Sequence, residues 1–346
     1  MARKTGKDAK VEVEVGTTFY AMAAISSVSS PAADVRKKYK LAGAQYVSDQ
    51  DNLQPDIRLD GVISGFTITA GSANNSVDVS AGEVYIKGEE VSVIATTVTG
   101  LVRPMVSGNV LVIALTVDAD GNINKTEGIE GSAGGSRGAA GGQPYLPIDE
   151  VLIGYINMTY YTGSASGEDT VLTSEIDNET KERTIIPSYK LHYHNETENC
   201  GLVEFASALP LIHAEPGDAA AGTNARNVYA SYYSASFEEL SETKDFGFTD
   251  DIATINSKAY GDTYEEKALS TPSWSMSGSA FWTKVNDILT LIKNTKRWVK
   301  LYPDRDETAH WVGRGIIKVN RTVPVEGNMD AAVTVDGSGE LYDKTS

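Results

Sequence analysis

The sequence predicts a mainly β protein, and three observations carry that prediction. Thr, Ser, Gly, Val and Tyr are abundant, whereas long stretches of helical periodicity are scarce. Many short segments alternate apolar and polar residues, as strands with one buried face do. Turn-forming residues separate these segments at regular spacing. At 346 residues the chain is long for one domain and comfortable for two.

The clearest pattern lies in residues 253–342. Serines alternate with other side chains over residues 271–281, which predicts a half-buried strand. The spacing then becomes helical and predicts an amphipathic helix, whose apolar stripe is Phe281, Val285, Ile288, Leu289 and Ile292. Alternation returns in residues 298–302, 310–325 and 332–342, which predict three more strands. All four tryptophans lie near the helix, and we expect them in the core between helix and sheet.

Two long strands are predicted elsewhere, at residues 11–24 and 229–240. The acidic segment 241–252 follows the second strand and is expected to be a mobile loop between long strands. The polar residues 42–56 lack any period and are expected to form a linker. The basic cluster at 34–40 is interpreted as a solvated strand or a connector at a domain boundary. No aromatic or Gly-rich context supports nucleic-acid recognition there.

The middle of the chain predicts a sandwich or small barrel of short strands. The candidate strands are Gly61–Ala70, Asn75–Val79, Glu83–Ile86, Glu90–Thr99, Asn109–Val117, Val151–Tyr161, Thr184–Tyr193 and Gly201–Leu209. The Gly-rich segment from Gly128 to Gln143 is expected to be a flexible loop. It is not a phosphate loop, because no Lys-Ser/Thr pair follows it.

The net charge of −17 is concentrated in the middle of the chain. Residues 32–222 carry twelve Lys and Arg against twenty-six Asp and Glu, for a net charge of −14. Such a chain is a poor general nucleic-acid binder, because affinity for phosphates needs clustered cations. It suits a concentrated soluble protein and a surface along which DNA slides without sticking. No apolar run approaches a membrane span and no signal-peptide core follows Met1, so we expect assembly in a cytoplasm.

No credible catalytic set is found, so no enzyme activity and no cofactor are predicted. The segment from Asp118 to Asn124 departs from a calcium loop and is interpreted as a hairpin turn. His192 and His194 share a strand face, but a solvated face is favoured over a metal site because no third ligand is identifiable. The single cysteine, Cys200, excludes an internal disulfide and is expected to be a small apolar residue.

Several segments, taken in order, carry a resemblance to a known family. The C-terminal part contains TINSKAYGDTYEEKALSTPSWSMSGSAFW, then the amphipathic helix, a short VKLY strand and GIIKVNRTVPVEGNMDAAVTVDGSGELY. The N-terminal part contains VGTTFY followed by ISSVSSP. In this order the segments resemble the major tail tube protein of long flexible-tailed, lambda-like bacteriophages. The resemblance covers about residues 1–31 and 223–346 and leaves the middle of the chain unexplained.

The resemblance implies a two-sheet tail-tube β-sandwich or barrel with one packed α-helix, in a structural virion protein. It implies homohexameric rings, whose inner sheets join into one barrel, and a helical stack of rings that conducts DNA to the host at ejection. The partners would be other copies of the chain, a tape-measure protein in the lumen, and tail terminator and distal tail proteins. DNA would pass transiently and non-specifically, with no membrane involved. The protein would lie in the tail of a siphophage virion.

Residues 1–32 and 223–346 are therefore predicted to form a discontinuous tail-tube domain, and residues 33–222 an inserted β-rich decoration domain. The residues predicted to line the lumen are Lys318, Asn320, Thr322, Thr334, Asp336, Ser338 and Glu340. Lys318 is expected to be neutralised across strands by Asp336 or Glu340. Contacts between rings are predicted for a basic arm and the acidic loop, at Arg3, Lys4, Lys7, Lys10, Glu242, Asp245, Asp250 and Asp251.

Two other functions stay open at this point. The chain could be a tail-tip, baseplate or fibre component whose inserted domain binds sugars or protein on the host surface, which a Ser-, Thr-, Gly- and Tyr-rich middle would suit. It could also be a glycan hydrolase with paired carboxylates. The poor catalytic inventory counts against the hydrolase.

Overall fold

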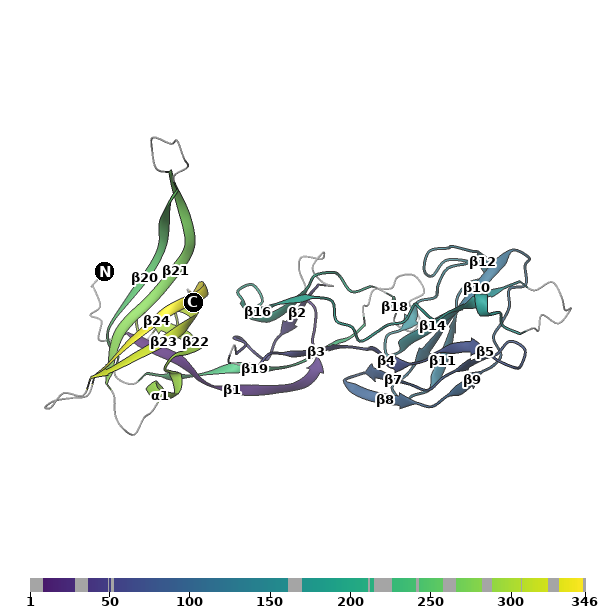
Figure 1. The fold of residues 1–346 in the computed structure, drawn as a ribbon, viewed down its shortest axis with the longest axis horizontal. Helices are drawn as coiled ribbons and strands as arrows, with labels where there is room; N and C mark the ends of the chain where they lie inside the picture. Colours follow the sequence, from purple (N-terminus) through teal and green to yellow (C-terminus); the bar gives the residue numbers. More distant parts are fainter. Residues whose placement is uncertain are drawn as a thin grey trace.

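The computed structural model describes residues 9–28, 37–48, 50, 53–160, 170–210, 212–214, 226–240, 243–257, 266–281, 288–305, 307–322 and 330–344. The molecule is elongated, with one large sheet at one end and several small sheets at the other (Figure 1). Nearly all regular elements in the described part are strands, so the predicted mainly β class is confirmed.

Eight antiparallel strands form the largest sheet, which we call the long sheet. Its strand order is β20-β21-β24-β23-β22-β1-β19-β3. The strands are β1 (Lys10–Ala24), β3 (Asp56–Leu59), β19 (Val228–Glu239), β20 (Thr243–Ser257), β21 (Glu266–Phe281), β22 (Thr295–Tyr302), β23 (His310–Thr322) and β24 (Asp330–Lys344). The long strands predicted near both ends of the chain are confirmed, with residues 323–325 outside the described part.

One face of the long sheet is apolar, because alternate residues along each strand point to the same side. Its buried cluster includes Val11, Val13, Trp274, Met276, Val299, Ile317, Val319, Val333 and Val335. The sheet curls over this face, since Phe248 of β20 stacks on Trp311 of β23 with ring centroids 5.4 Å apart. The curl encloses a core although no second large sheet lies against this face in the described part.

The predicted helix is described only over its last part. The described helix α1 (Ile288–Ile292) has five residues, and residues 282–287, including Val285 and Trp282, lie outside the described part. Ile292 is fully buried in the core of the long sheet, and Ile288 packs partly against the same core. The predicted apolar stripe therefore meets the sheet at these two positions.

The loop predicted at residues 241–252 is wrong. Residues 243–257 form β20, which pairs along its length with β21. Phe246 and Phe248 occupy alternate positions and pack against the core. The segment therefore has the alternation of a strand in addition to its acidic residues. β20 lies at the edge of the long sheet, where charged residues are common because they discourage pairing with other chains.

A three-stranded sheet lies beside the outer ends of β1 and β19, and we call it the middle sheet. Its order is β16-β17-β2, with β2 (Lys38–Leu41), β16 (Tyr189–Asn195) and β17 (Cys200–Phe205). Leu41 and Phe205 pack in one buried cluster with Leu59 of β3 and Ala230 of β19. The middle sheet is thereby fixed to the long strands.

The linker predicted at residues 42–56 is also wrong. Tyr46 and Val47 are buried, and the Val47 N–H donates to the Tyr193 carbonyl at 2.8 Å. The indole N–H of Trp298 donates to the Val47 carbonyl at 2.9 Å. This segment bridges the middle sheet and the long sheet, and its lack of period reflects irregular backbone that is nevertheless packed.

The remaining strands form the distal lobe, which comprises residues 60–183 with 212–214. Its sheets are β11-β10-β14-β15 with β12 on β10, β4-β7-β8, β5-β6-β9 and β13-β18. The elements are β4 (Gly61–Gly65), β5 (Ile68–Ala70), β6 (Val77–Val79), β7 (Gly82–Ile86), β8 (Glu89–Val93), β9 (Thr96–Val98), β10 (Asn109–Val117), β11 (Ile123–Glu127), β12 (Gly131–Ser132), β13 (Leu146–Pro147), β14 (Val151–Thr159), η3 (Thr173–Glu175), β15 (Ile176–Asp177) and β18 (His213–Ala214). The strand predicted at 61–70 is divided because Phe66 takes a left-handed φ of 59°.

The Gly-rich segment 128–143 is a packed part of this lobe, which corrects the flexible loop predicted there. Ile129 and Ala140 form a β-bridge, and the Gly141 N–H donates to the Ile129 carbonyl at 2.7 Å. A Cβ atom added at Gly142 would lie 2.0 Å from the Ser136 carbonyl oxygen. The glycines here permit close approach of two backbones, a role that composition alone does not separate from flexibility.

The chain enters and leaves the distal lobe at neighbouring points. Val62 and Arg183 form a parallel β-bridge, and the Thr184 N–H donates to the Val62 carbonyl at 3.3 Å. The predicted division at residues 33–222 stays a prediction. The structure adds that β2, β3 and the segment around Tyr46 lie within those bounds yet pack on the long strands.

Candidate functional site on the polar face of the long sheet

The face of the long sheet opposite its apolar core is largely polar across five neighbouring strands. Residues that oppose each other in register share a face, so rows of side chains can be followed from strand to strand. One row consists of Thr249, Ser275, Asp336, Ile316 and Lys296. The next row consists of Gly247, Ser277, Thr334 and Lys318. We call this surface the polar face.

The predicted lumen residues of β23 and of the first half of β24 lie on the polar face. Lys318 and Asn320 are exposed, Thr334 and Asp336 are half-buried, and the side chain of Thr322 is outside the description. Lys318 forms an ion pair with Asp336, which confirms the expected cross-strand neutralisation. These side chains are 60% and 46% exposed, so the pair contributes at most about 1 kcal/mol. That the face lines a channel stays a prediction.

The other two predicted lumen residues, Ser338 and Glu340, lie where the pairing of β23 with β24 shifts register. Gly339 between them has a left-handed φ of 98°, and its carbonyl accepts the indole N–H of Trp274 at 3.2 Å. The indole sits over glycines of both strands. A Cβ atom on Gly313 or Gly337 would lie 2.5 Å from Trp274 ring atoms. The bulge therefore belongs to a slot that holds this tryptophan.

Towards β1 the same face is covered by residues 46–48 and Gln50. Trp298 is 1% exposed and lies 5.0 Å from the Tyr46 ring, measured between centroids. The buried carboxylate of Glu14 accepts hydrogen bonds from the Ser48 hydroxyl at 2.6 Å and the Gln50 side-chain amide at 3.0 Å. The exposed polar face is thus limited to the part of the sheet running from β20 to the start of β22.

The residues predicted to join successive rings are only partly described. Arg3, Lys4, Lys7 and Glu242 lie outside the described residues. Lys10 is engaged within its own chain, 2.5 Å from a Glu12 carboxylate oxygen and 4.7 Å from the centre of the Tyr302 ring. β20 includes Asp245, Asp250 and Asp251, whose side chains lie outside the described part of the structure. A role between rings stays a prediction.

Sequence reasoning did not assign most members of the polar face to it. Ser275 and Ser277 were recognised only as the polar side of a strand, and Thr249, Ile316 and Lys296 were not predicted to lie there. The alternation of β21 was visible in the sequence, but the pairing of β21 with β24 was not. Register across strands that are distant in sequence has no local signal, so the rows could not be assembled beforehand.

The histidines outside this face bind neighbouring protein groups. His192 Nε2 lies 2.7 Å from a Glu204 carboxylate oxygen, and His194 Nδ1 lies 2.8 Å from the Gln45 carbonyl oxygen. Burial lowers the pKa of His194. Within the described ranges no group of three His, Cys, Asp or Glu side chains is arranged to hold a metal ion. The two neighbouring histidines on β16 thus engage separate partners.

Two smaller predictions about chemistry are confirmed. Asp118 accepts hydrogen bonds from the backbone N–H groups of Asp120 and Asn122, which closes the hairpin turn between β10 and β11. Cys200 is 4% exposed, and burial raises the pKa of its thiol. A buried thiol with a raised pKa is a poor nucleophile, which agrees with a packing role.

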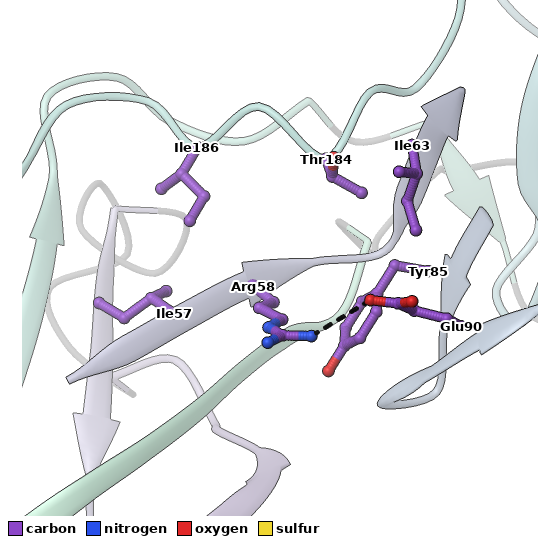
Figure 2. A pocket seen from close by; sticks show the side chains of 7 residues that line it. All are labelled: Ile57, Arg58, Ile63, Tyr85, Glu90, Thr184 and Ile186. Carbon is purple, nitrogen blue, oxygen red and sulfur yellow. Dashed lines mark ion pairs between the residues drawn. The ribbon is translucent and has the colours of Figure 1, made fainter. Parts of the chain in front are cut away.

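A cavity of about 250 Å³ lies where the long sheet meets the distal lobe (Figure 2). Its lining is Ile57, Arg58, Ile63, Tyr85, Glu90, Thr184 and Ile186. The Arg58 guanidinium lies 3.7 Å from a Glu90 carboxylate oxygen and 5.2 Å from the centre of the Tyr85 ring. Because the single cation is paired with acids, this cavity has no net preference for a charged ligand.

A second cavity, of about 300 Å³, differs in its charge. Its lining is Arg137, Leu152, Tyr155, Thr180, Lys181, Glu182, Arg183, Pro210, Ile212 and Arg226. Four of these residues are cations and one is a carboxylate. We call it the basic cavity. In a chain of net charge −17 such a concentration of positive charge needs an explanation.

Comparisons with known proteins give a likeness to solved structures but no match by sequence. No protein family model matches the chain, and no curated protein matches it. Among solved structures, the chain is similar to the tail of an empty GTA particle, determined by helical refinement with C6 symmetry. The likeness has 14% sequence identity and covers 32% of this chain and 87% of the other, with a TM-score of 0.24. A TM-score of this size is too low to establish a shared fold.

The search for membrane-spanning helices gives a negative result. Among the residues that the structure describes, no helix has the length and apolar character needed to cross a bilayer.

Proposed function

We propose that the protein is a structural subunit of a phage tail, and that its copies form hexameric rings stacked into the tail tube. The observation that carries the proposal is the polar face, a continuous surface across five strands that is backed by a buried apolar core. Short polar side chains dominate it, and Lys318 is neutralised by Asp336. Such a face offers phosphates no cluster of free cations, as a conduit for DNA requires.

The edge of the long sheet supports assembly of this kind. β20 has fifteen residues and pairs only with β21 in the described part of the chain. A strand of that length at an edge presents unpaired backbone groups that another chain can satisfy. In the proposed ring a neighbouring subunit covers this edge, so that the sheets of six copies close into one barrel and remove their edges.

The partners follow from the tube proposal and from the sequence resemblance to tail tube proteins. Within the tube, the polar face would meet a tape-measure protein and later the passing DNA. At the two ends of the tube, terminator and distal tail proteins would bind the exposed rings. No catalytic activity is proposed, and an assay for release of reducing sugar from bacterial surface glycans should give no signal above a heat-treated control.

Electron microscopy of the purified chain tests assembly directly. We expect rings or tubes, whereas a monodisperse monomer at every protein and salt concentration tried would contradict the proposal. A labelling experiment tests which face lies inside. Cys200 is buried and should contribute little background, so cysteine can be introduced at the exposed positions Asn320 and Ser92.

In the unassembled protein both introduced cysteines should react with a maleimide carried on a large polymer. After assembly Asn320→Cys should become protected, while Ser92→Cys on the distal lobe should still react. Equal reactivity of Asn320→Cys before and after assembly would place the polar face outside the tube.

A second candidate function is a tail-tip, baseplate or fibre component that binds the host surface. The observation in its favour is that the distal lobe lies at the opposite end of the molecule from β20 to β24 and adjoins two cavities (Figure 1). Copy number in a purified particle separates the two functions. A tube subunit is the most abundant tail protein, whereas a tip component is present in few copies.

A further inference from the structure

The basic cavity of the distal lobe has the features of a binding site for a small organic anion. We propose that it binds a sugar residue carrying a carboxylate or a phosphate group. This proposal concerns the distal lobe alone and holds whether the protein forms the tube or the tip of a tail.

The Gly-rich segment fixes the first cation at this cavity. Arg137 donates to the Pro144 carbonyl at 2.7 Å, to the Tyr155 hydroxyl at 3.0 Å and to the Gln143 side-chain oxygen at 2.6 Å. All three acceptors are neutral, so the guanidinium is held in place while its charge stays uncompensated. The close backbone packing of the Gly-rich segment thereby holds one arginine at the edge of this cavity.

A second cation is held in the same manner. One terminal nitrogen of Arg226 donates to the backbone carbonyls of Asp60 at 3.1 Å and Arg183 at 2.6 Å. Burial lowers the pKa of Arg226, which means that its charge is poorly solvated where it lies. A desolvated guanidinium gains from an anionic ligand more than a solvated one does, because the interaction takes place at low effective dielectric.

The carboxylate that lines the cavity is already occupied. One Glu182 oxygen lies 3.0 Å from His213 Nε2, and the other accepts the Leu152 N–H at 3.1 Å. Burial opposes protonation of His213, but the hydrogen bond and the charge of Glu182 outweigh it and raise the pKa of the imidazole. A protonated His213 would neutralise Glu182 and leave the four lining cations in excess over the nearby carboxylate of Asp60, whose charge acts on Arg226.

Two other acids of this region accept hydrogen bonds from neutral groups and form no ion pair with the lining cations, which all lie among the described residues. Asp60 accepts from the Lys87 N–H at 3.0 Å and the Asn227 side chain at 3.2 Å, and Asp177 accepts from the Glu179 N–H at 2.9 Å. Within the described part of the chain, none of the four lining cations forms an ion pair. The cavity therefore presents a local positive potential in an acidic protein.

The rest of the lining indicates what the anion is attached to. Leu152, Pro210 and Ile212 supply aliphatic surface, and the Thr180 side chain supplies a hydroxyl. A volume of about 300 Å³ suits a single ring rather than a polymer segment lying flat. The planar guanidinium group can donate two parallel hydrogen bonds to two oxygens of a carboxylate or a phosphate. A six-membered sugar with one acidic substituent satisfies the charge, the size and the mixed polarity together.

Binding can be measured by calorimetry with glucuronate, glucose 6-phosphate, glucose and inorganic phosphate in a buffer free of multivalent anions. We expect saturable one-to-one binding of at least one acidic sugar and none of glucose up to about 10 mM. Comparison of the first two probes identifies whether the carboxylate or the phosphate is preferred. Inorganic phosphate that binds as tightly as glucose 6-phosphate would overturn the assignment to a sugar.

The matched variants are Arg183→Gln and Arg58→Gln. Arg183 is exposed and the Arg58 side chain is 42% exposed, so neither change should unfold the protein, but only Arg183 lines the basic cavity. Arg183→Gln should weaken the acidic sugar by about tenfold, the loss expected for one charge-assisted hydrogen bond, and Arg58→Gln should not change it. Equal effects of both variants, equal binding of glucose, or no saturable binding of any acidic probe would refute the site.

Discussion

Two deletions that differ in their boundaries test how the chain is divided. The first replaces residues 33–222, the predicted insertion, by a short Gly-Ser linker. The second replaces residues 61–183, where the chain enters and leaves the distal lobe. Val62 and Arg183 are bridged, so a short linker spans the second gap without strain. The two variants keep the same long strands at both ends of the chain and differ in whether the middle sheet, β3 and the segment around Tyr46 are retained.

The expected cost of the wider deletion can be worked from the buried clusters. It removes Tyr46, which packs on Trp298 and Val312, and it removes most of the cluster that covers Val228 and Tyr232. The four residues that stay behind and lose their cover are Trp298, Val312, Val228 and Tyr232. Exposing one buried side chain of this size costs about 1.5–3 kcal/mol, so together they cost about 6–12 kcal/mol. That equals the whole stability of a typical domain, about 5–15 kcal/mol. The narrower deletion leaves both clusters intact.

Thermal unfolding followed by near-ultraviolet circular dichroism measures the difference, because Trp298 reports packing between the long sheet and residues 46–47. We expect the 61–183 variant to unfold cooperatively and the 33–222 variant to be aggregated or to lack a cooperative transition. The reasoning would be refuted if the 33–222 variant unfolded cooperatively near the temperature of the parent. Several linker lengths should be tried in both variants, so that failure of one linker is not mistaken for failure of the fold.

Three further predictions concern single residues. Ile292→Asp should lower the free energy of unfolding in urea by about 3 kcal/mol or more, because Ile292 is fully buried, whereas Leu291→Asp on the exposed side should change it by about 0.5 kcal/mol or less. Gly315→Val should lower the free energy of unfolding by about 1–3 kcal/mol, because the added side chain would overpack the core of the long sheet. Gly247→Val should be tolerated, because the nearest non-adjacent atom lies 3.8 Å from its added Cβ. Equal melting temperatures of the two variants would contradict this. Burial raises the pKa of Asp60 to about 6, so between about pH 4 and pH 6 the native state binds a proton that the unfolded chain releases. The free energy of unfolding should therefore rise by about 1–2 kcal/mol as pH falls from about 8 to 5. Urea titrations should show a flatter dependence on pH for Asp60→Asn.

The sequence predicted the strands of the long sheet well because their signal is local. Alternation in β21, β23 and β24 could be counted along each segment, and residues such as Met276, Ile317, Val333 and Val335 are buried on the side where it placed them. Charge misled the prediction at β20, where acidic residues outweighed the alternation of Phe246 and Phe248. Composition misled it at residues 128–143, since glycine is common both in flexible loops and where backbones pack closely.

The cavities could not be predicted from the sequence, because their residues come from distant segments. Arg137 and Arg226 are 89 positions apart, and nothing near either residue in the sequence indicates the other. The packed segment 42–56 was missed for a similar reason. Its burial depends on Trp298, which follows some 250 residues later and reaches back to the Val47 carbonyl.

The two proposals predict different electrostatic behaviour, and the dependence of binding on ionic strength distinguishes them. On the polar face Lys318 is already paired, so contact with DNA should stay weak even at low ionic strength. In the basic cavity the lining cations outnumber the lining carboxylate, so binding of an acidic sugar should be measurable at low salt and should weaken as salt rises. Duplex DNA is too wide to enter a cavity of about 300 Å³. It should therefore not compete with the sugar, and competition by DNA fragments would mean that the measured binding takes place on an open basic surface instead.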